Sequence, residues 1–209
     1  MISVGEARDL YDGADAVHDF DHVLRVLRLA EHLARTEGAK LPIVRAATLL
    51  HDVGRRQAVS TGADHARVSV SVAREVLAGQ PARDVEAIVH AIAAHRFRTQ
   101  PQPSTLEAKV LFDADKLDAI GAVGVARAFA YAGAHGQRLW VPMTSVDFDH
   151  WVAHGDDANL HTPVHEFVVK LSRVKDRLFT ETGRKIAAER HDTMNAFFQR
   201  LSEEVRGLA

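Results

Sequence analysis

The dipeptide His51-Asp52 combines two residue types that could do chemistry at one position in the chain. It follows the apolar run 46–50 and precedes Gly54. This run predicts a buried helix, which would deliver an imidazole and a carboxylate into the interior. A buried carboxylate without compensation costs on the order of several kcal/mol, so it needs a hydrogen-bond partner, an ion pair or a metal ion.

Two other segments offer ligands of the same kind. His22 lies upstream of the dipeptide, and an acidic stretch that contains Asp115 lies downstream. Neutral imidazole suits Zn, Fe, Mn, Co and Ni, whereas carboxylate oxygen suits harder ions such as Mg and Mn. Together, His22, His51, Asp52 and Asp115 indicate a divalent-cation site without thiolates. The pattern by itself does not name a reaction.

Several other residues have structural explanations that compete with a metal site. Asp113 lies two residues before Asp115, so on a helix its side chain should point elsewhere. A lone histidine is more often structural, and an Asp-x-Asp pair is more often a solvated turn or cap. Two i,i+4 histidine pairs lack a nearby carboxylate and are expected to be structural: His150/His154 and His161/His165.

The elements that must position these residues are predicted to be helices. Apolar residues recur at three- and four-residue steps, which is the amphipathic pattern. Helices are expected over residues 22–35, 42–53, 64–77, 83–95, 106–112 and 120–132. Gly38 and Pro42 favour a stop and a new start between the first two. Residues 161–208 predict two long helices broken near Thr182-Gly183, and no alternating strand pattern was found.

Composition limits the class of protein. The chain has 209 residues, 46% apolar and 26% charged, which is typical of a soluble globular protein. Helical periodicity without a strand pattern predicts a single all-α domain over 1–209. Its metal-binding core is expected at about 16–132, and its C-terminal helical part at about 144–209. A net charge of −2 gives no general attraction to nucleic acid, and the absence of cysteine excludes disulfides and thiolate chemistry. Without a signal-peptide pattern in 1–15 or an apolar run of ~20 residues, we expect a cytoplasmic protein.

Four segments in order resemble a known family. They are His22-Val-Leu-Arg-Val, Leu50-His-Asp-Val-Gly, Asp113-Ala-Asp-Lys-Leu-Asp and Thr180-Glu-Thr-Gly-Arg. The first three look like the H…HD…D pattern of the HD-domain metal-dependent phosphohydrolases. The similarity is closer to the small bacterial HD hydrolases that include nucleoside-triphosphate pyrophosphatases, with an HDxxH start at 18–22 and a helix ending like His95-Arg96-Phe97. It extends from about His18 to beyond His191.

This resemblance implies an HD-domain helical bundle, and the C-terminal pair of long helices expected from periodicity would pack on it. It also implies one divalent ion held by His22, His51, Asp52 and Asp115. Mn²⁺ is the expected ion, with Mg²⁺, Fe²⁺, Co²⁺, Ni²⁺ or Zn²⁺ as alternatives, and a second ion remains open.

The implied chemistry is hydrolysis of phosphate esters or anhydrides in nucleotides, with (deoxy)nucleoside triphosphate to monophosphate and pyrophosphate as the expected reaction. The metal-bound Asp52 could orient the attacking water, while His65 and His95 match histidines that HD enzymes bring to the substrate, as proton donors or electrostatic stabilisers. His18 is expected to support a metal ligand, with a helix cap as the alternative. Candidate phosphate contacts are Arg55, Arg56 and Lys116.

Other functions remain open at this point. A 5′-nucleotidase or a phosphodiesterase could use the same metal ligands, and a nucleotide-binding sensor without turnover is the alternative from another class. The expected partner is a small-molecule nucleotide, with no nucleic acid and no membrane. A homodimer is an open alternative for the assembly.

Overall fold

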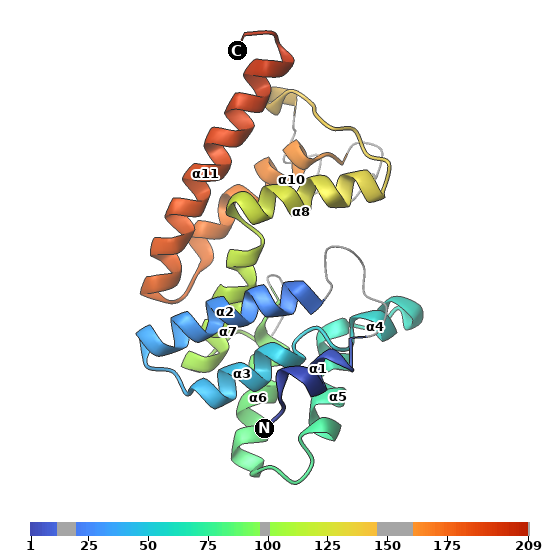
Figure 1. Ribbon diagram of the computed structural model, residues 1–209, viewed down its shortest axis with the longest axis vertical. Helices are drawn as coiled ribbons and strands as arrows, with labels where there is room; N and C mark the ends of the chain where they lie inside the picture. The colour runs from blue at the N-terminus through green and yellow to red at the C-terminus, as the bar shows by residue number, and fades with distance from the viewer. Residues whose placement is uncertain (12–19, 97–100, 146–160, 209) are drawn as a thin grey trace. The chain divides into compact units, whose positions relative to one another are not determined.

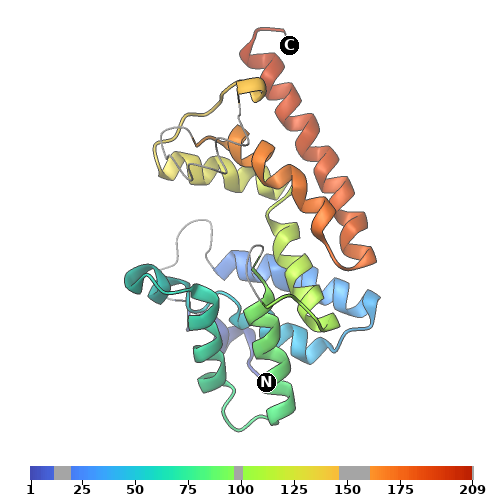
Figure 2. The same cartoon turned by 180° about the vertical axis from the view of Figure 1, so that it is seen from behind.

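Helices form all the regular structure in the described part of the chain, which confirms the all-α prediction. The computed structural model describes residues 1–11, 20–96, 101–145 and 161–208. Its contacts divide the chain into two compact units (Figures 1 and 2). Unit 1 consists of Met1–Lys116 with Leu178–Gly183, and unit 2 of Leu117–Arg177 with Arg184–Ala209. The single domain over the whole chain stays a prediction.

Unit 1 is built around the short apolar helix α3. Its elements are α1 (Val4–Arg8), α2 (Phe20–Glu37), α3 (Leu41–Leu50), α4 (Arg55–Thr61), α5 (His65–Val76), α6 (Ala82–Ala94) and α7 (Leu106–Asp118), whose last two residues belong to unit 2. Helix α3 packs against both α2 and α6, and α5 packs against α4 and α6. Most of α3 is therefore buried, and its C-terminal end lies in the interior of the unit.

The local sequence explains where these helices begin and end. The apolar stripe predicted for residues 22–35 is the buried face of α2. Gly38 has φ +79°, a left-handed conformation that glycine adopts at little cost, and it ends α2. Pro42 lies in the first turn of α3, and the Asp64 carboxylate accepts the backbone N–H of Arg67 at 3.1 Å to cap α5.

Gly54 lets the turn after α3 lie directly against α5. Its N–H donates to the Ser69 hydroxyl at 2.9 Å. A Cβ at this position would lie 2.5 Å from the backbone nitrogen of Ser69, so any larger residue would force the two segments apart. The close approach joins the end of α3 to the helix whose first residue is His65.

Unit 2 is held together by aromatic side chains. It contains α8 (Gly121–Ala134), the 3₁₀ turns η1 (Met143–Ser145) and η2 (Leu171–Arg177), α10 (Pro163–Val169) and most of α11 (Glu181–Val205). Helix α10 packs against α8 and η2. The ring of Phe198 stacks on that of Phe167, with 4.4 Å between the centroids, and also on that of Phe129 at 6.3 Å.

The predicted C-terminal pair of long helices is wrong in its first member. Residues 163–177 form the seven-residue helix α10 and a seven-residue 3₁₀ segment, and only α11 is long. The break lies before Glu181, because the N–H groups of Phe179 and Thr180 donate to the Asp113 carboxylate instead of to helix carbonyls. The Thr180 hydroxyl then accepts the N–H of Gly183 at 3.0 Å, so Gly183 lies in the first turn of α11.

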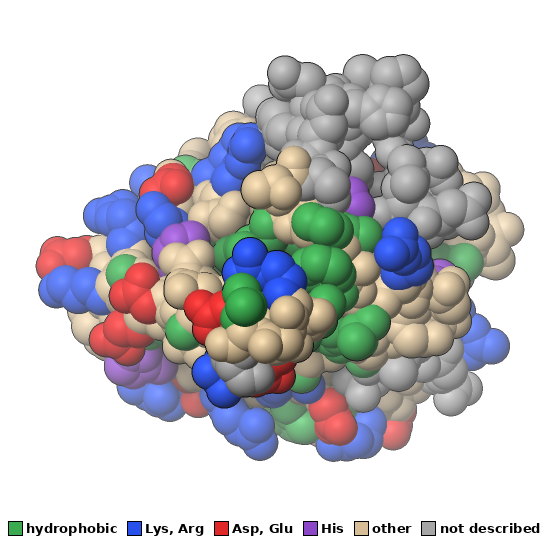
Figure 3. All heavy atoms as spheres, turned by 90° about the horizontal axis from the view of Figure 1, so that it is seen from above, with side chains coloured by type: hydrophobic (Ala, Val, Ile, Leu, Met, Phe, Trp, Pro, Cys, Tyr) green, Lys and Arg blue, Asp and Glu red, His purple; other side chains and the backbone are tan. Residues whose placement is uncertain are grey.

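Apolar surface remains exposed in both units. In the view from above, hydrophobic side chains gather on the visible face beside Lys and Arg (Figure 3). In unit 2 the exposed large hydrophobic side chains are Tyr131, Leu139, Phe197, Val205 and Leu208. No single described helix is long and apolar enough to cross a membrane, although α7 and α8 would pass that test if the bent pair were counted together.

Candidate metal centre

His51 and Asp52 lie where α3 ends. His51 is the C-terminal cap of the helix, and its side chain is fully buried, while Asp52 is 5% exposed. The His51 Nδ1 atom lies 2.7 Å from the carbonyl oxygen of Thr48. Since a carbonyl can only accept, Nδ1 carries the proton and Nε2 presents its lone pair, which is the form that binds a metal ion.

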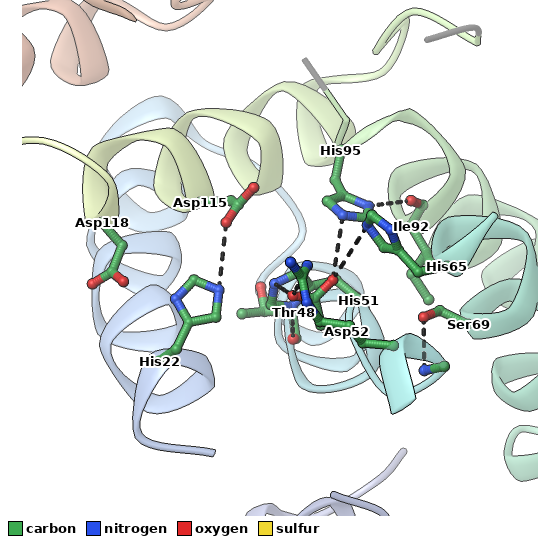
Figure 4. Close-up of polar contacts among 12 residues, drawn as sticks. His22, Thr48, His51, Asp52, His65, Ser69, Ile92, His95, Asp115 and Asp118 are labelled. Carbon is green, nitrogen blue, oxygen red and sulfur yellow. Dashed lines mark hydrogen bonds and ion pairs between the residues drawn. The ribbon is translucent and has the colours of Figure 1, made fainter. Parts of the chain in front are cut away.

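His22 and Asp115 approach the same point from α2 and α7 (Figure 4). The His22 Nε2 atom lies 3.5 Å from Oδ1 of Asp115, and its ring centroid lies 5.5 Å from that of His51. One ligand atom each from His22, His51 and Asp52 lies within 4.8 Å of the others. The structure therefore brings three of the four predicted ligands within reach of one ion. Asp115 contacts His22 but lies outside that group.

His65 and His95 approach the Asp52 carboxylate from the side away from His22 (Figure 4). His65 is the first residue of α5, and His95 caps the C-terminus of α6. Each Nε2 atom lies 3.6 Å from Oδ1 of Asp52. The His95 Nδ1 atom lies 2.6 Å from the carbonyl oxygen of Ile92, which fixes the same tautomer as in His51. We call the set His22, His51, Asp52, His65, His95 and Asp115 the histidine–aspartate cluster.

Burial and charge set the protonation states in the cluster. Burial lowers the pKa of both His51 and His65 to about 4, so both rings are neutral near pH 7. Burial alone would raise the pKa of Asp52, but His51, His95 and a nearby guanidinium outweigh it and hold this pKa well below its usual range. Burial opposes ionisation of Asp115 as well, yet the Lys116 ammonium and the imidazoles lower its pKa. Neutral imidazoles beside ionised carboxylates are the donor set that a cation requires.

Two buried atoms of the cluster are evidence for a metal site. The His51 Nε2 and Asp52 Oδ1 atoms have no hydrogen-bond partner. Buried polar atoms are normally satisfied, so two unsatisfied lone pairs in one cluster suggest a ligand that accepts both. Within the described residues, two groups have the geometry to hold an ion, and Asp52 belongs to both. The cluster is thus consistent with a divalent-metal site, and the ligand assignment itself stays a prediction.

The predicted phosphate-binding residues lie at different depths. The Arg55 Nη1 atom lies 3.4 Å from Oδ2 of Asp52, and the Lys116 Nζ atom lies 2.5 Å from Oδ2 of Asp115. Arg56 is exposed on α4. Two of the three cations therefore already contact carboxylates of the cluster, and their role toward phosphate stays a prediction.

Other predicted histidines are placed elsewhere or lie outside the described residues. His18, His150 and His154 belong to the segments that the structure does not describe. In unit 2, His161 forms an ion pair with Glu166 at 3.3 Å, and His165 shares a hydrogen bond with the Thr162 hydroxyl. Neither His161 nor His165 belongs to a metal-holding group among the described residues.

Asp113 is buried but turned to a different partner from that of Asp115, as its helical position predicts. Its Oδ2 atom accepts the Thr180 N–H at 2.7 Å and the Thr180 hydroxyl at 2.6 Å, and its Oδ1 atom accepts the N–H of Phe179 at 2.9 Å. These bonds hold residues 178–183 to unit 1. Asp113 is therefore a structural anchor two residues from a predicted ligand.

Sequence reasoning missed Tyr11, whose hydroxyl oxygen lies 3.3 Å from the backbone nitrogen of Asp52. Burial, followed by the Asp52 charge, raises the pKa of the Tyr11 phenol, which stays protonated. A signal for the helix before it was available: Ser3 and Glu6 form a capping box that begins α1. Nothing in the local pattern connects Tyr11 to the cluster.

Comparison with known proteins places these observations in context. A family model described as the HD domain matches residues 19–120. YpgQ of Bacillus subtilis (strain 168) is 36% identical over 197 residues, which cover 91% of this chain and 86% of that protein. The crystal structure of Bacillus subtilis YpgQ in complex with ADP matches with a TM-score of 0.74 and 33% identity, covering 99% of this chain and 100% of that chain. Ribonuclease Y of Chloroflexus aurantiacus is 33% identical over 150 residues, which cover 60% of this chain and 28% of that protein.

The first prediction concerns the dipeptide at the end of α3. Chelation should lower the melting temperature of the wild type, because an ion that binds only the folded state stabilises it by about 3 kcal/mol at a hundredfold excess over Kd. His51→Ala and Asp52→Ala should each lose the ion, keep the helical circular dichroism and respond little to chelator. His32→Ala, at an exposed position of α2, is the control and should behave as the wild type. Equal metal content in the wild type and Asp52→Ala would contradict the assignment.

The second prediction separates two acids of α7. Asp115→Asn should weaken metal binding by at least the roughly 10- to 100-fold that is lost when a residue supporting a metal ligand is mutated. Asp113→Asn should instead lower the free energy of unfolding by about 1–3 kcal/mol, since an amide N–H₂ would face the N–H groups of Phe179 and Thr180. Metal titration and denaturant unfolding of both variants measure the two effects. Greater metal loss in Asp113→Asn would mean that the wrong carboxylate is assigned.

Proposed function

Since this chain belongs to the HD-domain family, close to YpgQ and similar small bacterial HD-superfamily hydrolases, we propose that it hydrolyses nucleotide phosphate bonds with a divalent metal ion. Its all-α fold is that of the HD domain. The expected reaction converts a (deoxy)nucleoside triphosphate to the monophosphate and pyrophosphate, with Mn²⁺ as the supporting ion.

The proposal rests on one observation: atoms of the histidine–aspartate cluster with unused lone pairs, which could bind a metal ion, lie close together. The His51 Nε2 and Asp52 Oδ1 atoms are buried without a hydrogen-bond partner, His22 lies beside them, and Asp115 contacts His22. These four residues would hold the ion. When bound, such an ion supplies Lewis-acid polarisation of a phosphoryl oxygen and makes a water molecule more acidic.

The nucleotide part of the proposal is supported by a relative. YpgQ of Bacillus subtilis was crystallised in complex with ADP, and that structure covers 99% of this chain. ADP carries the base, sugar and diphosphate that a nucleoside triphosphate also has. A likeness over the whole chain therefore favours a nucleotide over a smaller phosphate ester.

His65 and His95 act on the substrate side of the cluster in this proposal. His65 is half-buried, with its side chain 21% exposed, whereas that of His95 is 4% exposed. Because burial lowers the pKa of His65 to about 4, its ring is neutral near pH 7. It would therefore stabilise the transferring phosphoryl group through a hydrogen bond, the second of the two expected roles, rather than donate a proton as an imidazolium. The Nδ1 atom of His95 is held by the Ile92 carbonyl, so its Nε2 atom points toward Oδ1 of Asp52, as does Nε2 of His65.

Arg55 and Lys116 would bind the phosphates of the nucleotide. Both carry their positive charge beside a carboxylate of the cluster, with Arg55 on Asp52 and Lys116 on Asp115. A phosphate that enters next to these carboxylates meets a guanidinium and an ammonium already in place. Arg56, exposed on the same helix as Arg55, would contact the outer part of the substrate.

A second candidate function is a phosphodiesterase. The observation in its favour is the 33% identity to part of ribonuclease Y over 150 residues. The same ligands and the same histidines would serve the cleavage of a diester. The similarity reaches only 28% of that protein, whereas the likeness to YpgQ covers nearly all of both chains, so the nucleotide hydrolase is favoured.

The third prediction tests the reaction by its products. With Mn²⁺ present, nucleoside triphosphates should yield monophosphate and pyrophosphate, and Ca²⁺ should support the reaction less well because it prefers more oxygen ligands. Separation of the products from a panel of ribo- and deoxynucleotides at fixed metal concentration gives the answer. Orthophosphate released from monophosphates would indicate a 5′-nucleotidase, and cleavage of diesters alone would indicate a phosphodiesterase. Binding of nucleotides without any product would indicate the non-catalytic sensor.

The fourth prediction distinguishes a residue that acts on the substrate from a residue that binds the metal ion. His95→Ala should lower kcat by roughly 100- to 10,000-fold, the usual contribution of an acid–base group, while metal content changes little. His90→Ala is the control on the same helix, because the His90 ring bonds to Ser104. Loss of the ion from His95→Ala as complete as from His51→Ala would assign His95 to the metal.

A further inference from the structure

Tyr11 is fixed in unit 1 by the helix before it and by an aromatic neighbour. The capping box of Ser3 and Glu6 begins α1. Tyr11 is partly buried and packs against a hydrophobic cluster made of Ala7, Phe20, Val23, Leu27 and Leu49. The ring of Tyr11 packs on that of Phe20, with 5.3 Å between the centroids. Its hydroxyl is thereby directed at the end of α3.

The Tyr11 hydroxyl makes two hydrogen bonds with the backbone there. It donates to the carbonyl oxygen of Leu49 at 3.0 Å and accepts the N–H of Asp52 at 3.3 Å. Both backbone groups lie at the point where the regular helix stops. The phenol thus brackets the residues Leu50 and His51 between its two partners.

The helix itself cannot satisfy these two groups. In a continued α-helix the N–H of Asp52 would donate to the carbonyl of Thr48. That carbonyl already accepts from the backbone N–H and the ring of His51. The N–H of Val53, which would reach Leu49, donates to Leu50 instead. The chain turns out of the helix here, and one hydroxyl satisfies the donor and the acceptor that the turn leaves behind.

We propose that Tyr11 is a positioning residue that holds the backbone of the His51-Asp52 turn, so that both side chains point at the metal ion. This inference rests on the proposed metal site. The Tyr11 hydroxyl donates to Leu49 and accepts from Asp52 at once, which the side chain of a phenylalanine in the same place cannot do. Tyr11 lies before residue 19, outside the part of the chain that matches the HD-domain model.

The test compares two variants that make the same chemical change. The chain has two tyrosines, Tyr11 and Tyr131, and Tyr131 is 41% exposed on α8. Tyr11→Phe keeps the ring against Phe20 and removes only the hydroxyl, and Tyr131→Phe is the control. For each protein we would measure Mn²⁺ affinity, the visible spectrum of the Co²⁺ form, kcat and KM for a nucleoside triphosphate, and backbone amide exchange without metal.

In Tyr11→Phe the Mn²⁺ Kd should rise about tenfold, the Co²⁺ spectrum should shift, and kcat should fall more than KM changes. In the metal-free protein the Asp52 amide should exchange faster, while the Ala47 amide inside α3 stays as protected as in the wild type. Tyr131→Phe should match the wild type in all of these measurements.

Unchanged affinity and spectrum in Tyr11→Phe, or faster exchange at both Asp52 and Ala47, would overturn the inference, because the hydroxyl would then serve only general stability. Absence of bound metal in the wild type would overturn the proposed function instead. The exchange comparison needs no metal and would still decide whether Tyr11 holds the turn.

Discussion

Asp52 keeps a negative charge at the end of an apolar helix, where an isolated ionised carboxylate would cost on the order of several kcal/mol. Three imidazoles and a guanidinium lie within 4 Å of it and offset that cost. Among the imidazoles only His51 comes from the end of α3, so α5 and α6 must meet there to supply His65 and His95. Helix α2 adds His22, which contacts Asp115 of α7. The packing of unit 1 is arranged around this one charge, which is a reason for the small residue at Gly54, where α5 comes closest to the turn.

Features that depend on neighbouring residues could be predicted from the sequence. The buried face of α2 follows from apolar residues that recur with the helical period, and Gly38 and Asp64 mark helix ends through backbone conformation and a local hydrogen bond. The separation of Asp113 from Asp115 was equally predictable, because two residues on a helix point in different directions. His22, His51, Asp52 and Asp115 were grouped because their segments offer residue types that bind metal ions, and the family resemblance implied the same set. No local rule places residues from three helices within a few ångströms of each other.

Features that depend on bonds between distant residues were missed. The C-terminal pair of long helices was predicted from periodicity, but the N–H groups of Phe179 and Thr180 are taken by Asp113, 66 and 67 residues earlier, and the helix cannot continue through them. The link from Tyr11 to Asp52 likewise spans 41 residues and involves a backbone nitrogen, which carries no sequence signature. The helices expected over 42–53 and 64–77 left residues 55–64 without a predicted helix, although they contain α4, which ends at Gly62 with φ +68°.

The anchoring of residues 178–183 on Asp113 also has a meaning for the order in which the protein forms. Unit 1 is discontinuous in the sequence. Most of it has been synthesised once the ribosome reaches Lys116, but its second segment is complete only at Gly183. Until then the Asp113 carboxylate lacks the three donors that satisfy it in the finished protein. Long-range closure of this kind slows folding, so the earlier part of unit 1 must wait while the intervening residues of unit 2 are synthesised. The nascent chain therefore completes unit 1 late, and a fragment that stops at residue 120 would lack the three donors that Phe179 and Thr180 give to Asp113.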